Sequence, residues 1–220
     1  MNVFEVMGPV MVGPSSSHTA GAVKIGYIAR QLLRDDVANA EILLHGSFLA
    51  TGVGHGTDRA LVAGLLSMKP DDERIPDSFS YARDAGMEYS FGGVELRHAH
   101  PNSALLKLQG KNGNKLELVG SSIGGGAINI DKIDGLDANF AAIYPTLIIH
   151  NVDEPGHVAD IATFLEKYSV NIATLKLSRD NRGGRAVMVI ECDQEVPLEL
   201  IEKLRQKKGI LKVSYLSMED

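Results

Sequence analysis

The sequence contains one cysteine, Cys192, and no tryptophan. A single thiol excludes a disulfide within the chain and a metal cluster held only by its own cysteines. Basic residues are also few: 22 Lys and Arg against 28 Asp and Glu give a formal net charge of −6, which argues against nucleic acid or an anionic membrane as the main partner. The first 13 residues lack a basic stretch, and Pro9 interrupts their short apolar run. We therefore expect no signal peptide, no membrane span and a cytoplasmic protein.

The most unusual stretch is residues 13–22, where Pro14 and two glycines enclose a row of polar side chains. Apolar residues at helical spacing follow directly, so these polar residues are predicted to open a helix over residues 21–33. The free N–H groups and positive dipole end of a helix favour an anion such as a carboxylate. One hydroxyl can simply cap the helix. A serine nucleophile activated by His18 is disfavoured, because neighbours in sequence seldom align as nucleophile and base. The candidate ligands of the anion are Ser15, Ser16, Ser17, His18 and Thr19.

A second polar stretch follows a predicted strand over residues 40–45. It contains Ser47 and a glycine-flanked histidine, His55, and it runs into an apolar helix that Thr57 or Asp58 can cap. A histidine titrates near neutral pH, which makes His55 a candidate general base. The alternative is a histidine that only hydrogen-bonds its own loop.

The middle of the chain predicts a third helix over residues 78–89 and then β structure. Residues 104–109 and 115–119 alternate apolar and polar positions around Asn112-Gly113, a strong hairpin signal. Residues 121–126 read as a third polar loop, in which Gly124 and Gly125 expose backbone N–H groups to a ligand or merely form a flexible turn. A phosphate cradle is disfavoured there, because no Lys-Ser/Thr pair follows.

Residues 98–102 hold two histidines and an asparagine around Pro101. Proline biases the preceding residue toward extended geometry, so His100 and Asn102 can point to one side. A polar strand end is an equally good interpretation. A metal site formed by His98, His100 and His55 is a lesser alternative, because no acidic partner accompanies them.

We place a domain boundary in residues 131–140, which gives two domains over residues 1–138 and 142–220. The second domain reads β-α-β-β-α-β, the order of a four-stranded antiparallel sheet with two helices on one face. The predicted fold class is therefore α+β, with an N-terminal α/β domain and a C-terminal ferredoxin-like domain. Cys192 lies in a β pattern of this second domain without a neighbouring base, so we assign it no catalytic role.

Two families resemble these patterns. The element order of the second domain, the turn at residues 153–156 and the start of its second strand resemble an ACT domain. Five N-terminal segments, residues 13–21, 45–47, 52–58, 100–102 and 122–126, resemble the iron-sulfur-dependent bacterial L-serine dehydratases. The pairing of an allosteric-substrate-binding-like domain with an ACT domain is similar to the beta chain of their two-chain form.

The resemblance implies an L-serine ammonia-lyase that converts L-serine to pyruvate and ammonia at a [4Fe-4S] cluster. Because this chain has one cysteine, the cluster is expected on a partner alpha subunit, with the active site where the two chains meet and no metal on this chain. The implied catalytic residues are His55, His18, His100 and Asn102. The implied substrate-binding residues are Ser15, Ser16, Ser17, Thr19, Ser47, Thr57, Gly124 and Gly125. The implied effector site of the ACT domain, which usually pairs as a homodimer, comprises Asn151, Asp153, Gly156, His157 and Asn171.

The alternative is a non-catalytic regulatory subunit that senses an amino acid. The positions of His18, His55 and His100 distinguish the two functions. Convergence of the three on one open surface favours catalysis, whereas scattered and buried histidines favour regulation.

Overall fold

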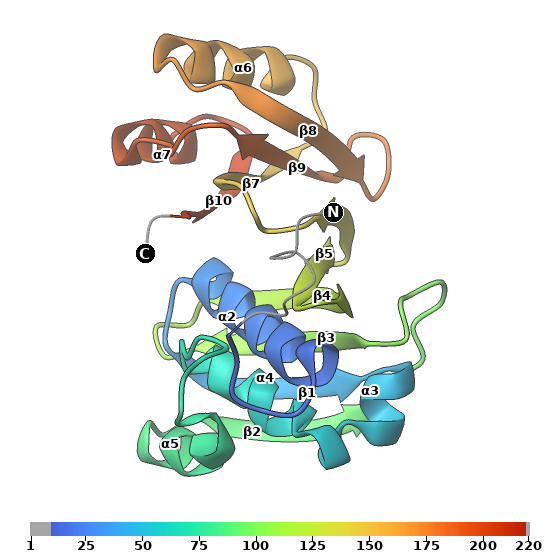
Figure 1. The fold of residues 1–220 in the computed structure, drawn as a ribbon. Helices are drawn as coiled ribbons and strands as arrows, with labels where there is room; N and C mark the ends of the chain where they lie inside the picture. Colours follow the sequence, from blue (N-terminus) through green and yellow to red (C-terminus); the bar gives the residue numbers. More distant parts are fainter. Residues whose placement is uncertain (1–9, 219–220) are drawn as a thin grey trace. The chain divides into compact units, whose positions relative to one another are not determined.

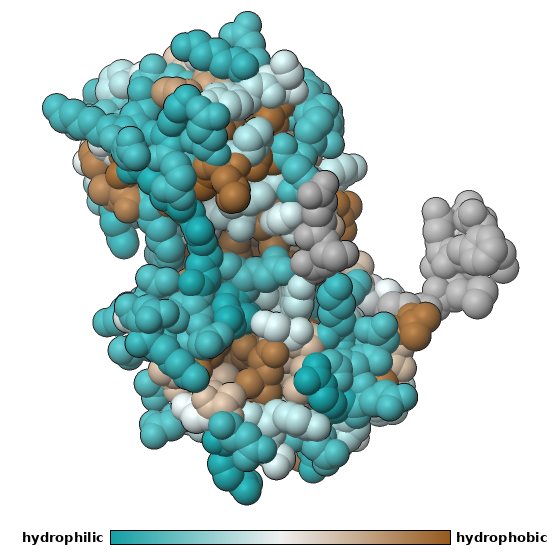
Figure 2. Space-filling view, turned by 90° about the vertical axis from the view of Figure 1, so that its left-hand side faces the viewer, coloured by the Kyte–Doolittle hydropathy of each residue, from teal (hydrophilic) through white to brown (hydrophobic). Residues whose placement is uncertain are grey.

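The computed structural model describes residues 10–218. Most of the N-terminal segment on which we predicted the absence of a signal peptide, residues 1–9, lies outside the described residues. The chain divides into two compact units, Met1–Asp134 and Gly135–Asp220, and the division falls within residues 131–140 (Figure 1). Within residues 10–218, no helix has the length and apolar character needed to cross a bilayer. Figure 2 shows a mostly hydrophilic face with a few hydrophobic patches.

The first unit is a mixed sheet covered by helices on one face. Its sheet has the strand order β2-β1-β3-β4-β5, with β1 and β2 parallel and the other pairs antiparallel. The elements in chain order are η1 (Ser16–Gly21), α2 (Ala22–Leu33), β1 (Val37–Leu44), α3 (Gly46–Thr51), η2 (Val53–His55), α4 (Thr57–Leu65), η3 (Ile75–Asp77), α5 (Ser78–Asp84), β2 (Glu88–Gly93), β3 (Ser103–Gly110), β4 (Lys115–Gly124) and β5 (Ala127–Ile133).

Helices α2 and α4 pack side by side in front of this sheet (Figure 1). Their backbones approach closely because Gly26 and Gly64 face one another. A Cβ atom on Gly64 would lie 2.1 Å from the carbonyl oxygen of Val23, and one on Gly26 would lie 2.4 Å from that of Leu61. This crossing fixes the relative positions of the two helix N-termini, which carry the polar stretches found in the sequence.

Several predictions for the first unit are confirmed. The polar residues before α2 do open a helix, although its first turn, η1, is a π-helix that begins at Ser16, five residues before the predicted start. The hairpin at Asn112-Gly113 joins β3 to β4, with Gly113 at φ 89°.

Other predictions for the first unit are wrong. The third helix ends at Asp84, because Gly86 adopts φ 67° and stops it, and the chain then forms the unpredicted strand β2. The N-cap of α4 is Gly56, without a side-chain hydrogen bond, so neither Thr57 nor Asp58 caps that helix. Residues 121–124 are not a loop, because β4 continues through Gly124.

The second unit confirms the ferredoxin-like prediction. Four of its five strands form an antiparallel sheet with the order β10-β7-β9-β8. Both helices pack on one face, where Leu165 of α6 and Leu204 of α7 join Leu147 and Met188 of the sheet in a single core that also contains Cys192. The elements are β6 (Leu136–Phe140), β7 (Thr146–Val152), α6 (His157–Lys167), β8 (Ile172–Arg179), β9 (Arg185–Cys192), α7 (Leu198–Arg205) and β10 (Ile210–Leu216).

Candidate active site

Polar segments that are far apart in sequence meet at one edge of the first sheet. Strand β1 ends there, β3 begins there, and β4 passes it where Ser103 pairs with Ser121. The start of α3 is joined to the loop before β3 by a 2.8 Å hydrogen bond from the Ser47 N–H to the Pro101 carbonyl. The structure therefore brings together three of the five segments that the sequence singled out, and contacts of His18 with Ser47 and with His55 add the other two.

His18 connects the first helix to α3. Its Nε2 lies 3.1 Å from the Ser47 hydroxyl and 3.2 Å from the Thr51 hydroxyl. Because the Thr51 hydroxyl donates its only proton to the Ser47 carbonyl, it accepts from His18, so the His18 Nε2 carries a hydrogen. This nitrogen is thus a donor held within the protein, which gives His18 a positioning role.

His18 and His55 form a pair. Their ring centroids are 5.0 Å apart, and the His18 ring also packs edge-on against the buried Phe48 at 5.4 Å. Burial lowers the pKa of His18, and the neighbouring His55 lowers this pKa further. His18 is therefore held neutral at neutral pH, so it adds no positive charge beside His55.

His55 has the opposite tautomer. Its Nδ1 lies 3.0 Å from the carbonyl oxygen of Thr51, which can only accept, so Nδ1 carries the hydrogen. The Nε2 atom of the neutral ring then bears a lone pair, and it has no hydrogen-bond partner among residues 10–218. Since the His55 side chain is exposed, this lone pair is available to a substrate.

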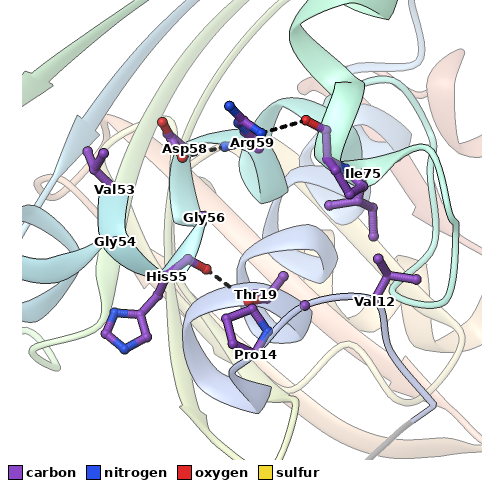
Figure 3. A pocket seen from close by; sticks show the side chains of 12 residues that line it. Val12, Pro14, Thr19, Val53, Gly54, His55, Gly56, Asp58, Arg59 and Ile75 are labelled. Atoms are coloured by element: carbon purple, nitrogen blue, oxygen red, sulfur yellow. Dashed lines mark hydrogen bonds between the residues drawn. The ribbon is translucent and has the colours of Figure 1, made fainter.

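Two predicted substrate ligands are corrected. Thr19 and Thr57 are buried, and each donates its hydroxyl proton to a main-chain carbonyl: Thr19 to His55 at 3.0 Å and Thr57 to His18 at 2.9 Å. Figure 3 shows the first of these bonds. Both threonines fasten one histidine loop to the other, so we assign them a positioning role in place of substrate contact.

The serine row opens the first helix as predicted. The Ser15 hydroxyl accepts from the His18 N–H at 3.0 Å and is the capping group. Ser16 and Ser17 are half-buried at the N-terminus of η1, and within residues 10–218 their hydroxyls have no hydrogen-bond partner. These two residues keep both hydroxyls and N–H groups available for an anion.

A cavity of about 400 Å³ lies beside the histidine loop. Its walls are the loop around Pro14, the loop at residues 53–56 and the buried Ile75. Figure 3 shows that Asp58 and Arg59 lie on the opposite side of the loop from the His55 ring. Arg59 donates to the Pro76 carbonyl at 2.9 Å, which fixes the far wall.

His100 and Asn102 lie in the loop that contacts Ser47. The Asn102 carbonyl accepts from the Ser122 N–H at 2.9 Å, and the His100 side chain is exposed. His100 thus joins His18 and His55 at one edge of the sheet. The alternative metal site with His98 finds no support, because in the described part of the chain no three His, Cys, Asp or Glu residues lie close enough to hold an ion.

Gly124 and Gly125 lie at the tip of the β4–β5 hairpin, two residues beyond Ser122. Both have positive φ angles, 102° and 61°, and no atom lies within 4 Å of the Cβ position of either. Their backbone is accessible at the same sheet edge, and their contact with substrate stays a prediction.

Four of the five predicted effector residues of the second unit lie close together, and Asn171 does not. Asn151, Asp153, Gly156 and His157 lie between the end of β7 and the start of α6. The Asp153 carboxylate accepts from the Gly183 N–H and from Arg179, which lower its pKa.

Asn171 lies elsewhere in the second unit. The next residue, Ile172, pairs with Cys192, whereas Asn151 pairs with Ala186, near the other end of β9. The side-chain amide of Asn171 donates a hydrogen bond to the Asp193 carboxylate at 2.6 Å. Within one chain, Asn171 therefore does not complete the predicted effector site.

Sequence reasoning missed three residues of the first site. Thr51 and Phe48 hold His18 from α3, and the buried Ser122 packs its hydroxyl against Gly21, where a Cβ atom would lie 2.1 Å from Oγ. The spacing of Ser47 and Thr51, four residues apart, would have identified the pair as neighbours on a helix had α3 been predicted.

Comparisons with known proteins match both parts of the chain to known families. The family described as "Serine dehydratase beta chain" matches residues 2–83, and the ACT domain family matches residues 145–209. The probable L-serine dehydratase beta chain of Bacillus subtilis (strain 168) is 36% identical over 216 residues, which cover 98% of each chain. The L-serine dehydratase beta chain of Peptoniphilus asaccharolyticus is 41% identical over 194 residues, covering 88% of this chain and 87% of that one.

A D-3-phosphoglycerate dehydrogenase of Bacillus subtilis is 22% identical over 201 residues, which span 90% of this chain but 37% of the enzyme. The two beta chains match almost from end to end at far higher identity, and they confirm the resemblance seen in the sequence. The chain belongs to the family of L-serine dehydratase beta chains.

Proposed function

We propose that this chain contributes one half of the active site of a two-chain L-serine dehydratase, in which an alpha chain supplies the other half. The names of its relatives support a partner chain and L-serine as substrate. The observation that carries the proposal is the meeting of His18, His55 and His100 at one accessible sheet edge. A subunit that only senses an amino acid would not need this arrangement, so the regulatory alternative is not favoured.

The [4Fe-4S] cluster belongs, in this proposal, to the alpha chain. The residues of this chain do not fit a cluster, because its one cysteine is fully buried in the core of the second unit and burial raises the pKa of the Cys192 thiol to about 11. A cluster with an open iron supplies a Lewis acid that eases loss of the substrate hydroxide.

The residues of this chain bind the substrate and accept its proton. Ser16 and Ser17 offer hydroxyls and N–H groups to the carboxylate at the positive end of a helix that continues to Leu33. The exposed His55 Nε2 accepts the proton from the α-carbon, since its other nitrogen is committed to Thr51. His18 stays neutral beside it and keeps the loop in place.

Exposed apolar side chains support the docking of a second chain at this edge. Leu49 on α3 is 51% exposed, Val53 in η2 is 77% exposed, and Ile123 near the end of β4 is 54% exposed. They come from the same elements that carry Ser47, His55 and Ser122. Large apolar groups around a polar site mark a surface that another protein covers.

The second unit acts, in this proposal, as an amino-acid sensor that pairs with a second copy. The Asn151 Oδ1 atom and both ring nitrogens of His157 are buried without a hydrogen-bond partner among the described residues, which leaves them for a ligand. The edge strand β8 exposes Leu175 and Leu177, and its free backbone edge suits pairing between copies.

The test is anaerobic reconstitution with the alpha chain, followed by an assay for pyruvate formed from L-serine. The chain alone should be inactive, and the complex should be active. His55→Gln should lower kcat by about 10²–10⁴-fold, the usual contribution of a general base. His98→Asn is the control, because His98 is an exposed histidine of the loop between β2 and β3 to which no role in the site is assigned. Near-normal turnover of the His55 variant would refute the base assignment, and activity of the isolated chain would refute the divided site.

A further inference from the structure

His100 is held in one tautomeric form by its own loop. Its Nδ1 lies 3.1 Å from the backbone N–H of Asn102 and accepts a hydrogen bond from it. A backbone amide can only donate, so the His100 Nδ1 must carry the lone pair. In a neutral imidazole the hydrogen then resides on Nε2.

The loop that imposes this form is fixed at every residue. The Ser103 hydroxyl donates to the His100 carbonyl at 2.6 Å, the Pro101 carbonyl accepts from Ser47, and the Asn102 carbonyl accepts from Ser122. In addition, Gly46 adopts φ 54° and packs so closely on Pro101 that a Cβ atom would lie 2.6 Å from its carbonyl oxygen. The Asn102 N–H therefore cannot turn away, and a proton on the His100 Nδ1 would face another N–H.

At the Nε2 atom, His55 and His100 therefore differ: one is a hydrogen-bond acceptor and the other is a donor. The His55 Nδ1 donates to Thr51, which leaves a lone pair on the His55 Nε2. The His100 Nδ1 accepts from Asn102, which leaves a hydrogen on the His100 Nε2. In each case a main-chain group makes the choice, so it does not depend on substrate.

We infer that His100 is a neutral hydrogen-bond donor that binds an oxygen of the amino-acid substrate through its Nε2–H, while His55 is the acceptor. The inference rests on the proposed function for the identity of the substrate. No proton transfer is assigned to His100: its hydrogen stays on Nε2 and stabilises the negative charge on the oxygen that it contacts.

The tautomer can be measured without activity. In the full chain with ¹⁵N-labelled histidine at pH 7, long-range ¹H–¹⁵N spectra should show a protonated, pyrrole-like Nε2 and an unprotonated, pyridine-like Nδ1 for His100, and the reverse for His55. The signals are assigned by their loss in His100→Gln and His55→Gln. A hydrogen on the His100 Nδ1, alone or together with one on Nε2, would overturn the inference.

The donor role is tested in the assembled complex with two amide substitutions. The glutamine amide reaches the position of the imidazole Nε2 and can donate there, whereas the asparagine amide reaches only the position of Nδ1. His100→Gln should keep kcat/KM within about tenfold of wild type, and His100→Asn should lose about 10²–10³-fold, the usual effect of removing one such donor.

The outcomes separate the two claims. Equal activity of His100→Gln, His100→Asn and the control His98→Asn would overturn the donor role even where His55→Gln is inactive. Wild-type turnover in every variant, including His55→Gln, would refute the proposed function and the donor role together, while the NMR result would still decide the tautomer.

Discussion

Replacing Gly64 by alanine tests how the two helices that carry the polar loops are held together. The new Cβ atom would lie 2.1 Å from the Val23 carbonyl oxygen and 2.6 Å from the Tyr27 nitrogen. Both are backbone atoms of α2 and cannot rotate away, so the helices must separate by about an ångström. Overpacking of this kind costs about 1–3 kcal/mol, and the higher helix propensity of alanine returns about 1 kcal/mol.

We therefore expect Gly64→Ala to destabilise the first unit by about 1 kcal/mol, which corresponds to a fall in Tm of about 3–5 °C for a unit of this size. Calorimetry of the full chain measures it, with the transition of the second unit as an internal reference. The matched control is Gly54→Ala, since no atom lies within 4 Å of that Cβ position and the φ of Gly54 is not positive. The reasoning is refuted if Gly64→Ala melts at or above the wild-type temperature.

Three further predictions concern Asp35, Cys192 and His18. Asp35→Ala should lower the urea midpoint by the equivalent of about 2–3 kcal/mol, because the buried Asp35 carboxylate accepts two hydrogen bonds from Asn112, one from the backbone and one from the side chain. Cys192 should react with iodoacetamide at pH 8 only after unfolding, because burial raises its thiol pKa to about 11; a labelling time course checks this. His18 should titrate below 6.5 by NMR and shift upward in His55→Gln. Since its folded pKa is lowered, the unfolded chain binds more protons, and the stability of the first unit should fall as the pH drops below 6.5.

Local sequence signals predicted the elements that depend on their own residues. The apolar spacing after the serine row predicted α2, the Asn112-Gly113 pair predicted the hairpin, and the order of elements predicted the ferredoxin-like unit. None of these depends on a distant contact. Residues that are close in sequence are enough to indicate a helical repeat, a turn that needs a positive φ and a β-α-β-β-α-β order.

The missed elements depend on distant partners. Strand β2 contains Gly92 and Gly93 and forms because it pairs in parallel with β1. Helix α3 begins at Gly46, whose φ is 54°, and the N–H groups of Ser47 and Phe48 donate to the carbonyl of Pro101. No local pattern in residues 46–51 predicts their hydrogen bonds to the Pro101 carbonyl. The candidate site was incomplete for the same reason: Thr51 joins His18 only once α3 exists.

The distance between Asn151 and Asn171 in the second unit connects effector binding to the pairing of two copies of the chain. From Ala186, opposite Asn151, to Cys192, opposite Ile172, is six residues of β9, or about 20 Å at the rise of a strand. One amino acid cannot span this distance. If it contacts both Asn151 and Asn171, the two side chains must come from different copies of the chain.

Effector binding and association must then be thermodynamically coupled, because a ligand that binds only the pair stabilises the pair. We expect an effector amino acid to lower the dimer dissociation constant measured by analytical ultracentrifugation. Asn171→Ala should weaken this effect while leaving the far-ultraviolet circular dichroism of the chain unchanged, since Asn171 is an exposed residue. An effector that binds with the same affinity at concentrations where the chain is monomeric would show that one copy forms the complete site, and Asn171 would then have no part in it.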